Sequence, residues 1–390
     1  MRTDWGRFDW IYFLAVVMLT IIGIVMIFST SGIVGFSYFQ DSYYFVKRHL
    51  VYVLVGVLAM GMGLALSPDR YRNWLFPGFS VSVLLLLLCF VPGLGVRIAG
   101  ATRWLNLVVF QFQPSEFAKF FVCVFLATYL SRKSERLSQF WRGMFPALAV
   151  TVLMVGILAL QPDLGNVLLL MFTTGILLFV SRTNLLHLVG LASIGLIFVI
   201  GSILTHPYQM ERVKGFLDPW ADPTGRSYHL VQSMIAVGSG GILGEGLGES
   251  KLKYFYIPLQ YADFIFAILC EEGGLVLATI TLILYAIVLF RGIALARRPG
   301  PLYYFYLGTG LTCFLILQAV INIGVVVGLL PVTGIPLTWI SFGGTAVIMS
   351  LFFAGVILRI GMLVPRGKHL PSEDQSVEIR RPPKFITFKG

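Results

Sequence analysis

Long apolar stretches alternate with short polar connections along most of the chain. A membrane-spanning helix needs about 20 mostly apolar residues, with a usual range of about 17–25. Ten stretches meet this requirement, at about residues 10–28, 50–66, 75–91, 116–131, 144–160, 164–180, 184–204, 264–290, 303–330 and 341–364. The pattern therefore predicts an all-α, polytopic membrane protein with ten transmembrane helices.

Two parts of this pattern need interpretation. Only Gln161-Pro162-Asp163 separates the fifth stretch from the sixth, and proline followed by aspartate indicates two helices rather than one long span. The last two stretches are long enough to require a tilt or a break. Residues that break helices are available there, namely Gly324, Gly328, Pro331, Gly334 and Pro336.

The basic residues predict the orientation. Most Lys and Arg residues fall at the two ends of the chain and in every second connection, and cytoplasmic segments carry this excess. We therefore expect both termini to be cytoplasmic, with a long extracytoplasmic loop, 205–262, between helices seven and eight. The chain divides into a ten-helix membrane domain, 1–365, and a basic, disordered cytoplasmic tail, 366–390, that touches anionic membrane lipids.

Composition supports a membrane protein and excludes other classes. Hydrophobic residues make up 57% of the chain and charged residues only 12%, whereas soluble domains carry roughly 25% charged residues. The net charge of +11 follows from the orientation signal, so no nucleic-acid partner is needed. The four cysteines lie inside apolar stretches and the five histidines lack ligand spacing, so we expect no transition-metal site.

Ionisable residues within membrane spans are costly and usually mark a functional site. Glu116 and Lys119 lie three residues apart at the start of the fourth stretch, on one helix face. They form either a local ion pair that anchors the helix end or part of a site. Asp163 faces the same outer boundary, where it can cap the sixth helix, act in a site, or do both.

A third group of acids opens the eighth stretch. Asp263 ends the long outer loop, which could deliver substrate to it, although helix capping is an alternative role. Glu271 and Glu272 would lie about 12–13.5 Å deeper on a continuous helix, protonated or paired with a cation. A structural polar pair between helices is the alternative for these two residues.

The outer loops add basic and amphipathic candidates. Arg103, in a loop over 92–115, could hold an anionic headgroup. Within the long loop, 226–237 could form an interfacial amphipathic helix. Residues alone thus leave two classes: a transporter with a path through the membrane, or an enzyme acting on a lipid-linked substrate at the outer face.

Several motifs resemble those of the SEDS family (shape, elongation, division and sporulation), whose members include FtsW, RodA and SpoVE. They run in order from about residue 10 to 364. The stretches are ATRWLN at 101–106, FQPSE at 112–116 followed by Lys119, QPDLG at 161–165, FLDP at 216–219, DFIFA at 263–267, GIP at 334–336 and SFGG at 341–344. Residues 246–250 look closer to the FtsW/SpoVE branch.

The resemblance implies a peptidoglycan glycosyltransferase in the bacterial cytoplasmic membrane. Such an enzyme polymerises lipid II at the outer face and works with a class B penicillin-binding protein. The resemblance assigns the essential catalytic acid to Asp263 and supporting roles to Glu116, Lys119 and Asp163.

Chemistry is compatible with this assignment. Arg103 and Lys119 are candidates for holding the leaving pyrophosphate, and one displacement with one base would invert the anomeric centre. No cofactor is required, although a divalent cation could serve the pyrophosphate. The alternatives are a lipid II flippase and a non-catalytic scaffold for the penicillin-binding protein.

The chain departs from the family pattern at several positions near these motifs. Leu259 and Ala262 stand where family members commonly have glutamate and threonine. The late Pro-Leu-Pro-Phe pattern reads Pro-Leu-Thr-Trp at 336–339, and Glu-Glu-Leu-Gly reads Glu-Glu-Gly-Gly at 271–274.

Overall fold

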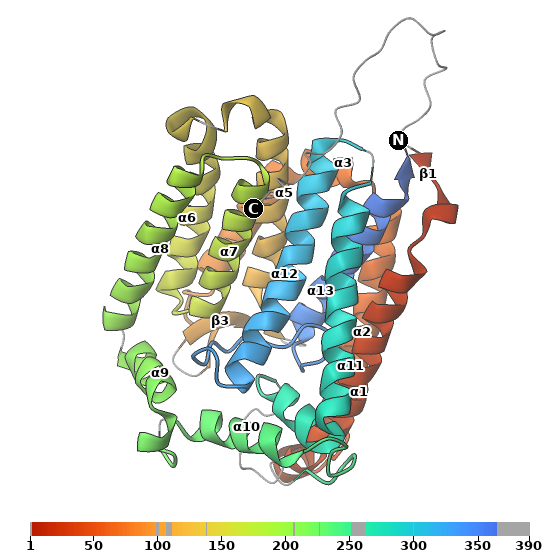
Figure 1. Ribbon diagram of the computed structural model, residues 1–390, viewed down its shortest axis with the longest axis vertical. Helices are drawn as coiled ribbons and strands as arrows, with labels where there is room; N and C mark the ends of the chain where they lie inside the picture. The colour runs from red at the N-terminus through yellow and green to blue at the C-terminus, as the bar shows by residue number, and fades with distance from the viewer. Residues whose placement is uncertain are drawn as a thin grey trace, which may run out of the picture.

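The computed structural model describes residues 2–98, 101–106, 111–137, 139–205, 207–225, 227–250, 262–298 and 300–364. The predicted tail, 366–390, and the part of the outer loop at 251–261 lie outside these ranges. The described chain is mostly helical, and its long helices run roughly along one direction, side by side in a bundle (Figure 1).

A helix lies over each predicted apolar stretch of the described chain. These helices are α1 (Trp10–Phe39), α2 (Tyr44–Ala65), α4 (Leu75–Leu88), α5 (Pro114–Arg132), α6 (Phe145–Leu160), α7 (Leu164–Val180), α8 (Leu185–Thr205), α11 (Ile265–Ala296), α12 (Leu302–Val326) and α13 (Gly344–Met362). By length and composition, seven helical segments of the described residues could cross a membrane, and α4 and α7 are shorter apolar helices. The protein is therefore a multi-pass membrane protein.

Shorter elements connect the long helices. The helical ones are η1 (Trp5–Arg7), α3 (Pro68–Asn73), η2 (Ser134–Arg136), η3 (Phe140–Met144), α9 (Pro207–Leu217), η4 (Pro219–Ala221) and α10 (Tyr228–Ser239). The strands β2 (Gly95–Ile98), β3 (Ala101–Asn106) and β4 (Gln111–Phe112) form an antiparallel sheet in the order β2-β3-β4. The predicted amphipathic helix at 226–237 is confirmed as α10, which packs against α11.

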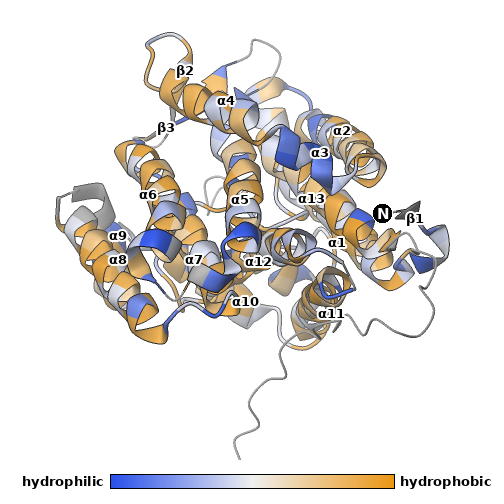
Figure 2. Ribbon diagram, turned by 90° about the horizontal axis from the view of Figure 1, so that it is seen from above, coloured by the Kyte–Doolittle hydropathy of each residue, from blue (hydrophilic) through white to orange (hydrophobic). Residues whose placement is uncertain are grey.

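The helices are apolar on their outer faces as well as in the core (Figure 2). Leu54 and Leu58 of α2 and Ile197 of α8 are examples of large apolar side chains that remain exposed. A helix that is apolar all round belongs in a lipid environment. The outer surface of the bundle therefore fits a hydrocarbon layer.

The centre of the bundle is formed by α12 and α13, whose residues are mostly buried. Helix α13 packs closely against α2 at two glycines. A Cβ atom on Gly63 would lie 2.8 Å from the Phe352 carbonyl oxygen, and one on Gly355 would lie 2.2 Å from the Met60 carbonyl oxygen. Small residues allow helix backbones in a membrane to approach this closely.

The predicted break near the last two helices is confirmed. Between α12 and α13, the segment 327–343 is irregular, yet much of it is buried. Its backbone is satisfied by side chains: Tyr285 Oη donates to the Thr338 carbonyl, and the Thr338 hydroxyl donates to the Leu315 carbonyl. Irregular backbone at membrane depth is tolerated where protein groups satisfy it in this way.

The predicted helix through Glu271 and Glu272 is confirmed, but α11 breaks just after this pair. The backbone leaves helical geometry at Gly274, with φ 60° and ψ −165°, so α11 consists of two helices joined there. The amide of Glu245 donates to the Glu271 carbonyl at 2.9 Å, and the amide of Gly246 donates to the Glu272 carbonyl at 3.1 Å. The acidic pair therefore faces the end of the outer loop, because the glycine-rich chain fills the break.

Both Glu271 and Glu272 are buried and bonded to serines. The Ser29 hydroxyl lies 2.6 and 2.7 Å from the two carboxylate oxygens of Glu272, and the Ser250 hydroxyl donates to Glu271. Their geometry is that of a polar contact that joins α1, the outer loop and the start of α11.

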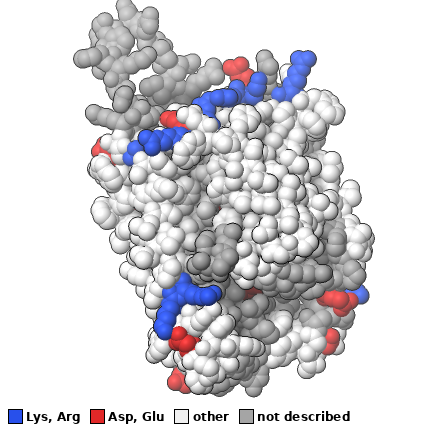
Figure 3. All heavy atoms as spheres, turned by 180° about the vertical axis from the view of Figure 1, so that it is seen from behind, with Lys and Arg blue, Asp and Glu red and all other residues white. Residues whose placement is uncertain are grey.

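The two ends of the described chain meet at one end of the bundle. Strand β1 (Arg2–Thr3) pairs with β5 (Leu363–Val364), and Arg298 donates to the carbonyl groups of Arg7 and Gly361 at 2.7 and 2.6 Å. Lys and Arg side chains gather over this end of the molecule (Figure 3). The two ends of the described chain therefore lie on the same side of the bundle.

Candidate active site

The predicted ion pair at the start of α5 is present and buried. Pro114 occupies the first turn, and Lys119 Nζ lies 2.6 Å from Glu116 Oε1. Both side chains are almost fully enclosed, at 2% and 4% exposed. Lys119 Nζ also donates to Gln318 Oε1 of α12 at 3.3 Å. This cation is therefore committed to protein partners in the interior of the bundle.

Asp163 both caps a helix and pairs with an arginine. Its carboxylate accepts hydrogen bonds from the Asn166 amide at 3.4 Å and from Asn166 Nδ2 at 2.8 Å, which confirms the cap of α7. Arg103 of β3 lies 3.5 Å from Asp163 Oδ1 and also donates to the Pro162 carbonyl. The capping and site roles that the sequence left open are thus compatible in one geometry.

Asp263 does not cap α11. The N-cap residue is Phe264, which makes no side-chain cap, and no described residue donates a hydrogen bond to the Asp263 carboxylate. The main-chain oxygen of Asp263 instead accepts from Asn322 Nδ2 of α12 at 2.7 Å. The backbone is therefore fixed while the half-buried carboxylate stays available for chemistry.

Two arginines surround this carboxylate. Burial raises the pKa of Asp263 above its usual range, while the positive charges of Arg212 and Arg103 act in the opposite direction. Gly334, with φ +73°, lets the backbone come close to the Arg103 guanidinium and the Asp263 carboxylate. A Cβ atom there would lie 3.7 Å from Arg103 Nη1 and 3.8 Å from Asp263 Oδ2.

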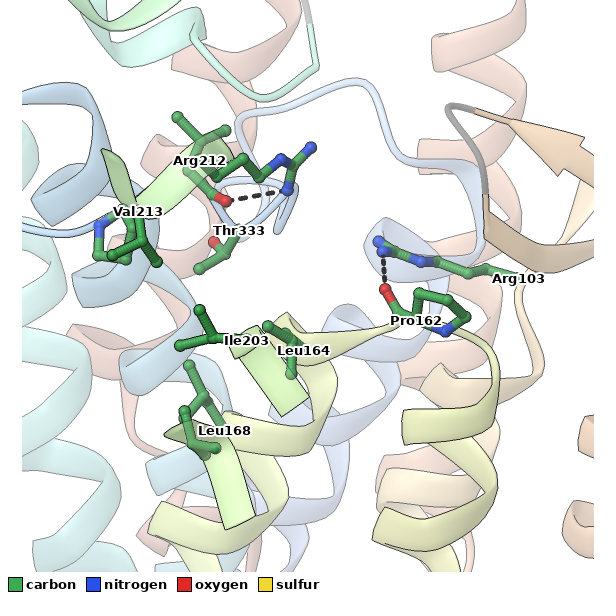
Figure 4. A pocket seen from close by; sticks show the side chains of 11 residues that line it. Arg103, Pro162, Leu164, Leu168, Ile203, Arg212, Val213 and Thr333 are labelled. Atoms are coloured by element: carbon green, nitrogen blue, oxygen red, sulfur yellow. Dashed lines mark hydrogen bonds between the residues drawn. The ribbon is translucent and has the colours of Figure 1, made fainter. Parts of the chain in front are cut away.

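A pocket of about 90 Å³ opens beside these charges (Figure 4). Its polar end carries Arg103 from β3 and Arg212 from α9, the latter donating to the Val332 carbonyl at 2.9 Å. Its apolar wall comes from Leu164 and Leu168 of α7 and from α8. The remaining lining residues are Pro162, Val199, Ile203, Val213, Pro331, Val332 and Thr333. Such a pocket suits a ligand with an anionic head and an apolar chain.

The predicted candidates fall into three groups in the structure. Arg103 lines the pocket, Asp163 pairs with Arg103, and Asp263 is influenced by the charges of Arg103 and Arg212. Glu116 and Lys119 do not line the pocket, and Lys119 contacts α12 at Gln318. Glu271 and Glu272 form a separate contact with the serines and the outer loop, as described above.

Sequence reasoning missed three residues that shape this region. Gln318 and Asn322 could have been identified from the sequence, because they are two amides four residues apart in an apolar span. Amide side chains within a span usually face other helices. Arg212 carried no such signal, because it is one of several basic residues in the outer loop and only the packing of α9 selects it.

The described residues offer no metal-binding cluster. Among them, no three or more His, Cys, Asp and Glu side chains group together as metal ligands. The four cysteines are free and buried.

Comparisons with known proteins agree with the motifs. Residues 9–364 match the FtsW/RodA/SpoVE family of cell cycle proteins. Stage V sporulation protein E of Bacillus subtilis is 38% identical over 352 residues, which cover 90% of this chain and 96% of that protein. A probable peptidoglycan glycosyltransferase FtsW of Geobacter sp. is 35% identical over 353 residues, with the same two coverages.

Solved structures resemble the fold. A chain from a peptidoglycan synthase complex, described as coordinating polymerization and crosslinking, matches with a TM-score of 0.75 and 32% identity. That match covers 92% of this chain and 98% of the other. The rod shape determining protein RodA of Thermus thermophilus matches with a TM-score of 0.68 and 28% identity, over 92% and 97% of the two chains. With its motifs, fold and relatives in agreement, the chain belongs to the SEDS family of FtsW, RodA and SpoVE.

Proposed function

We propose that the protein is a peptidoglycan glycosyltransferase that polymerises lipid II at the outer face of the bacterial cytoplasmic membrane. In this proposal ten helices cross the membrane, both termini are cytoplasmic, and the loop 205–262 is extracytoplasmic. The relatives named FtsW and SpoVE support the reaction class in division or sporulation. The observation that carries the proposal is the Asp263 carboxylate, which caps no helix and is influenced by Arg103 and Arg212, two arginines that line an apolar pocket.

Asp263 acts as the general base. Its carboxylate takes the proton from the 4-hydroxyl of the acceptor sugar while that oxygen attacks the anomeric carbon of the donor. The bond from the anomeric carbon to the lipid pyrophosphate breaks, and the pyrophosphate leaves with the electron pair. Burial favours this role because a carboxylate with a raised pKa holds a proton more strongly.

Arg103 and Arg212 stabilise the pyrophosphate. Guanidinium groups bind phosphate oxygens bidentately and keep their charge at any physiological pH. The apolar wall between α7 and α8 holds the start of the lipid chain. Lys119, also a candidate from the sequence, supports the site from within the bundle because its ammonium group is buried against Glu116 and Gln318.

Because one base drives one displacement without a covalent intermediate, the reaction inverts the donor anomeric centre. A penicillin-binding protein of class B is the proposed transpeptidase partner, and the similarity to a chain of a peptidoglycan synthase complex supports it. A flippase role is less well supported, since Glu271 and Glu272 are held in contacts with the outer loop and Ser29, and α11 breaks just after them at Gly274.

The test is lipid II polymerisation by the purified protein. We expect Asp263→Asn to abolish glycan synthesis, and Arg212→Ala to lower kcat/KM by about 10²–10³ through loss of charge stabilisation. The matched control is Asp41→Asn, which should retain full activity, because Asp41 is a partly exposed acid paired with Lys47 at 2.8 Å. Normal polymer from Asp263→Asn would refute the role of this residue as the base.

A further inference from the structure

Helix α12 carries a buried amide that holds two separate segments of the site. Asn322 is 2% exposed, and its Nδ2 donates to the carbonyl of Asp263 at 2.7 Å and to the carbonyl of Ile335 at 2.8 Å. Both partners are main-chain oxygens, which can only accept, so the nitrogen rather than the oxygen of the amide faces them. Both N–H groups of Asn322 are therefore committed.

The second segment held by this amide forms the opposite side of the site. Ile335 directly follows Gly334, and a Cβ atom on Gly334 would have both Asp263 Oδ2 and Arg103 Nη1 within 4 Å. Arg212 binds the same segment two residues earlier than Gly334, at the Val332 carbonyl. The backbone around Ile335 thus lies between the general base and the two arginines.

Gln318, one turn earlier on α12, extends this arrangement. Its Nε2 donates to the Pro336 carbonyl at 3.1 Å, and its Oε1 accepts from Lys119 at 3.3 Å. Residues at i and i+4 share one helix face. The same face of α12 therefore contacts the buried ion pair, the irregular segment and the backbone of Asp263.

The carbonyl oxygen of Asn322 is buried and has no hydrogen-bond partner among the described residues. Buried polar atoms are nearly always paired, so an unpaired one needs an explanation. The two N–H contacts provide it: rotating the amide to satisfy the oxygen would place that oxygen against two carbonyl groups. The side chain gives up one hydrogen bond to keep the two that join the segments.

We propose that Asn322 is a positioning residue for the glycosyl transfer, which sets the Asp263 carboxylate against Arg103 and Arg212 by holding the backbones of Asp263 and Ile335 together. The inference rests on the proposed role of Asp263 as the base. Asn322 acts through the backbone of Asp263 and does not itself touch the substrate.

The proposal predicts a change in the pH profile as well as in rate. Among the described residues, the charges that act on the Asp263 carboxylate are Arg212 on α9 and Arg103 on β3. Asp163 at the start of α7 pairs with Arg103, and His229 on α10 contacts Phe264, the residue after Asp263. The two arginine charges lower the pKa of Asp263 against the effect of burial. If the carboxylate moves away from them, its pKa rises, so the acid limb of kcat/KM moves to higher pH.

The experiment compares full-length wild type, Asn322→Ala, Asn322→Gln and Leu311→Ala in lipid II polymerisation as a function of pH. Asn322→Ala should lower kcat about a hundredfold, the size expected when a reacting group is displaced by about 1 Å. KM should change by less than about threefold, because substrate contacts remain. The acid limb should move to higher pH, and Asn322→Gln should restore part of kcat because it keeps the amide.

Leu311→Ala separates positioning from simple destabilisation. Leu311 is fully buried on the same helix, about 16 Å from Asn322 at about 1.5 Å per residue. Its truncation should lower thermal stability but leave kcat of the folded enzyme and the pH profile unchanged. An Asn322→Ala variant that also shows wild-type kcat and an unmoved acid limb would overturn the proposal.

Asp263→Asn serves as the reference for the underlying function. If Asp263→Asn retains polymerisation, the proposed base is wrong. If Asp263→Asn is inactive and Asn322→Ala behaves as wild type, only the positioning role fails. The two outcomes are distinct in the same assay.

Discussion

Separating the buried ion pair of α5 by mutation offers a direct test of how the interior of the bundle is stabilised. Lys119 and Glu116 meet at 2.6 Å with only 2% and 4% of their side chains exposed. We consider Glu116→Gln, Lys119→Met and the double variant. Each single change leaves one buried ionisable group without its partner, whereas the double change leaves a neutral amide and an apolar chain of similar size.

The expected energies follow from burial. Removing one partner of a buried pair costs about 3–5 kcal/mol, because the remaining charge is uncompensated. Replacing both partners with neutral groups of similar volume is often close to neutral. The double variant should therefore be more stable than either single variant, with a coupling free energy of several kcal/mol.

The chain provides a matched control in α9. Lys214 and Glu211 have the same spacing of three residues and meet at 3.1 Å, but their side chains are 51% and 49% exposed. Exposed pairs contribute about 0.2–1 kcal/mol. Glu211→Gln, Lys214→Met and their combination should therefore show a coupling free energy of that smaller size.

The assay is unfolding of the purified variants in detergent, analysed as two double-mutant cycles. Additive single changes at Glu116 and Lys119 would refute the reasoning, since a buried pair must couple. Lipid II polymerisation by the double variant adds a second result. Because Lys119 does not line the pocket, restored stability should bring back a measurable part of the activity.

Two further predictions concern the ends and the break of the helices. Gly274→Ala should severely impair folding, because φ is +60° there and a Cβ atom would lie 2.3 Å from the Gly244 amide nitrogen. Gly156→Ala is the control and should be tolerated, because a Cβ atom there would have no atom within 4 Å. Equal folding yields of the two variants would contradict this prediction. Asp9→Asn should destabilise the protein by about 1–3 kcal/mol in thermal unfolding, because Asp9 is buried and its carboxylate lies 2.5 Å from Arg291 Nη2. An unchanged Tm would show that this contact contributes nothing.

The positions of the membrane helices could be predicted from hydropathy because apolar runs determine where the chain can enter lipid. The residues at which the helices end could not be predicted as well. Helix α1 continues from the predicted end at residue 28 to Phe39, through small and aromatic residues that suit the membrane surface. Hydropathy measures burial in hydrocarbon, and a helix does not have to stop where the hydrocarbon does.

The break at Gly274 could not be predicted from the sequence either, because it depends on contacts with another segment of the chain. Glycine in an apolar helix lowers its stability by only about 1 kcal/mol, so it does not by itself end the helix. The break depends on the chain at 241–246, whose backbone groups pair with the carbonyl and amide groups around Gly274. That partner is distant in sequence, and neither segment alone indicates the pairing.

The candidate site shows the same division. Asp263, Glu116, Lys119 and Asp163 could be found because a charge at membrane depth is unusual in a sequence. Their separation into a group near Arg103 and Arg212 and a buried pair in the interior could not be predicted, since it depends on the tertiary contacts of α12 and α9. Arg212 illustrates the limit most clearly: only the fold distinguishes it from the other basic residues of its loop.

The pairing of β1 with β5 has a consequence for how the protein is made. Asp9 meets Arg291 across 282 residues of chain, and β1 must wait still longer for β5. At a synthesis rate of about 5–20 residues per second, this interval lasts about a quarter of a minute to a minute. Until Arg291 is made, the Asp9 carboxylate at the start of the first helix has the hydrogen bond from the Tyr12 amide but lacks its arginine partner. Helix α13 is the last helix to be synthesised, and it packs against α2 and α1. A nascent chain stopped before α13 would therefore leave the α13-contacting faces of α1 and α2 uncovered.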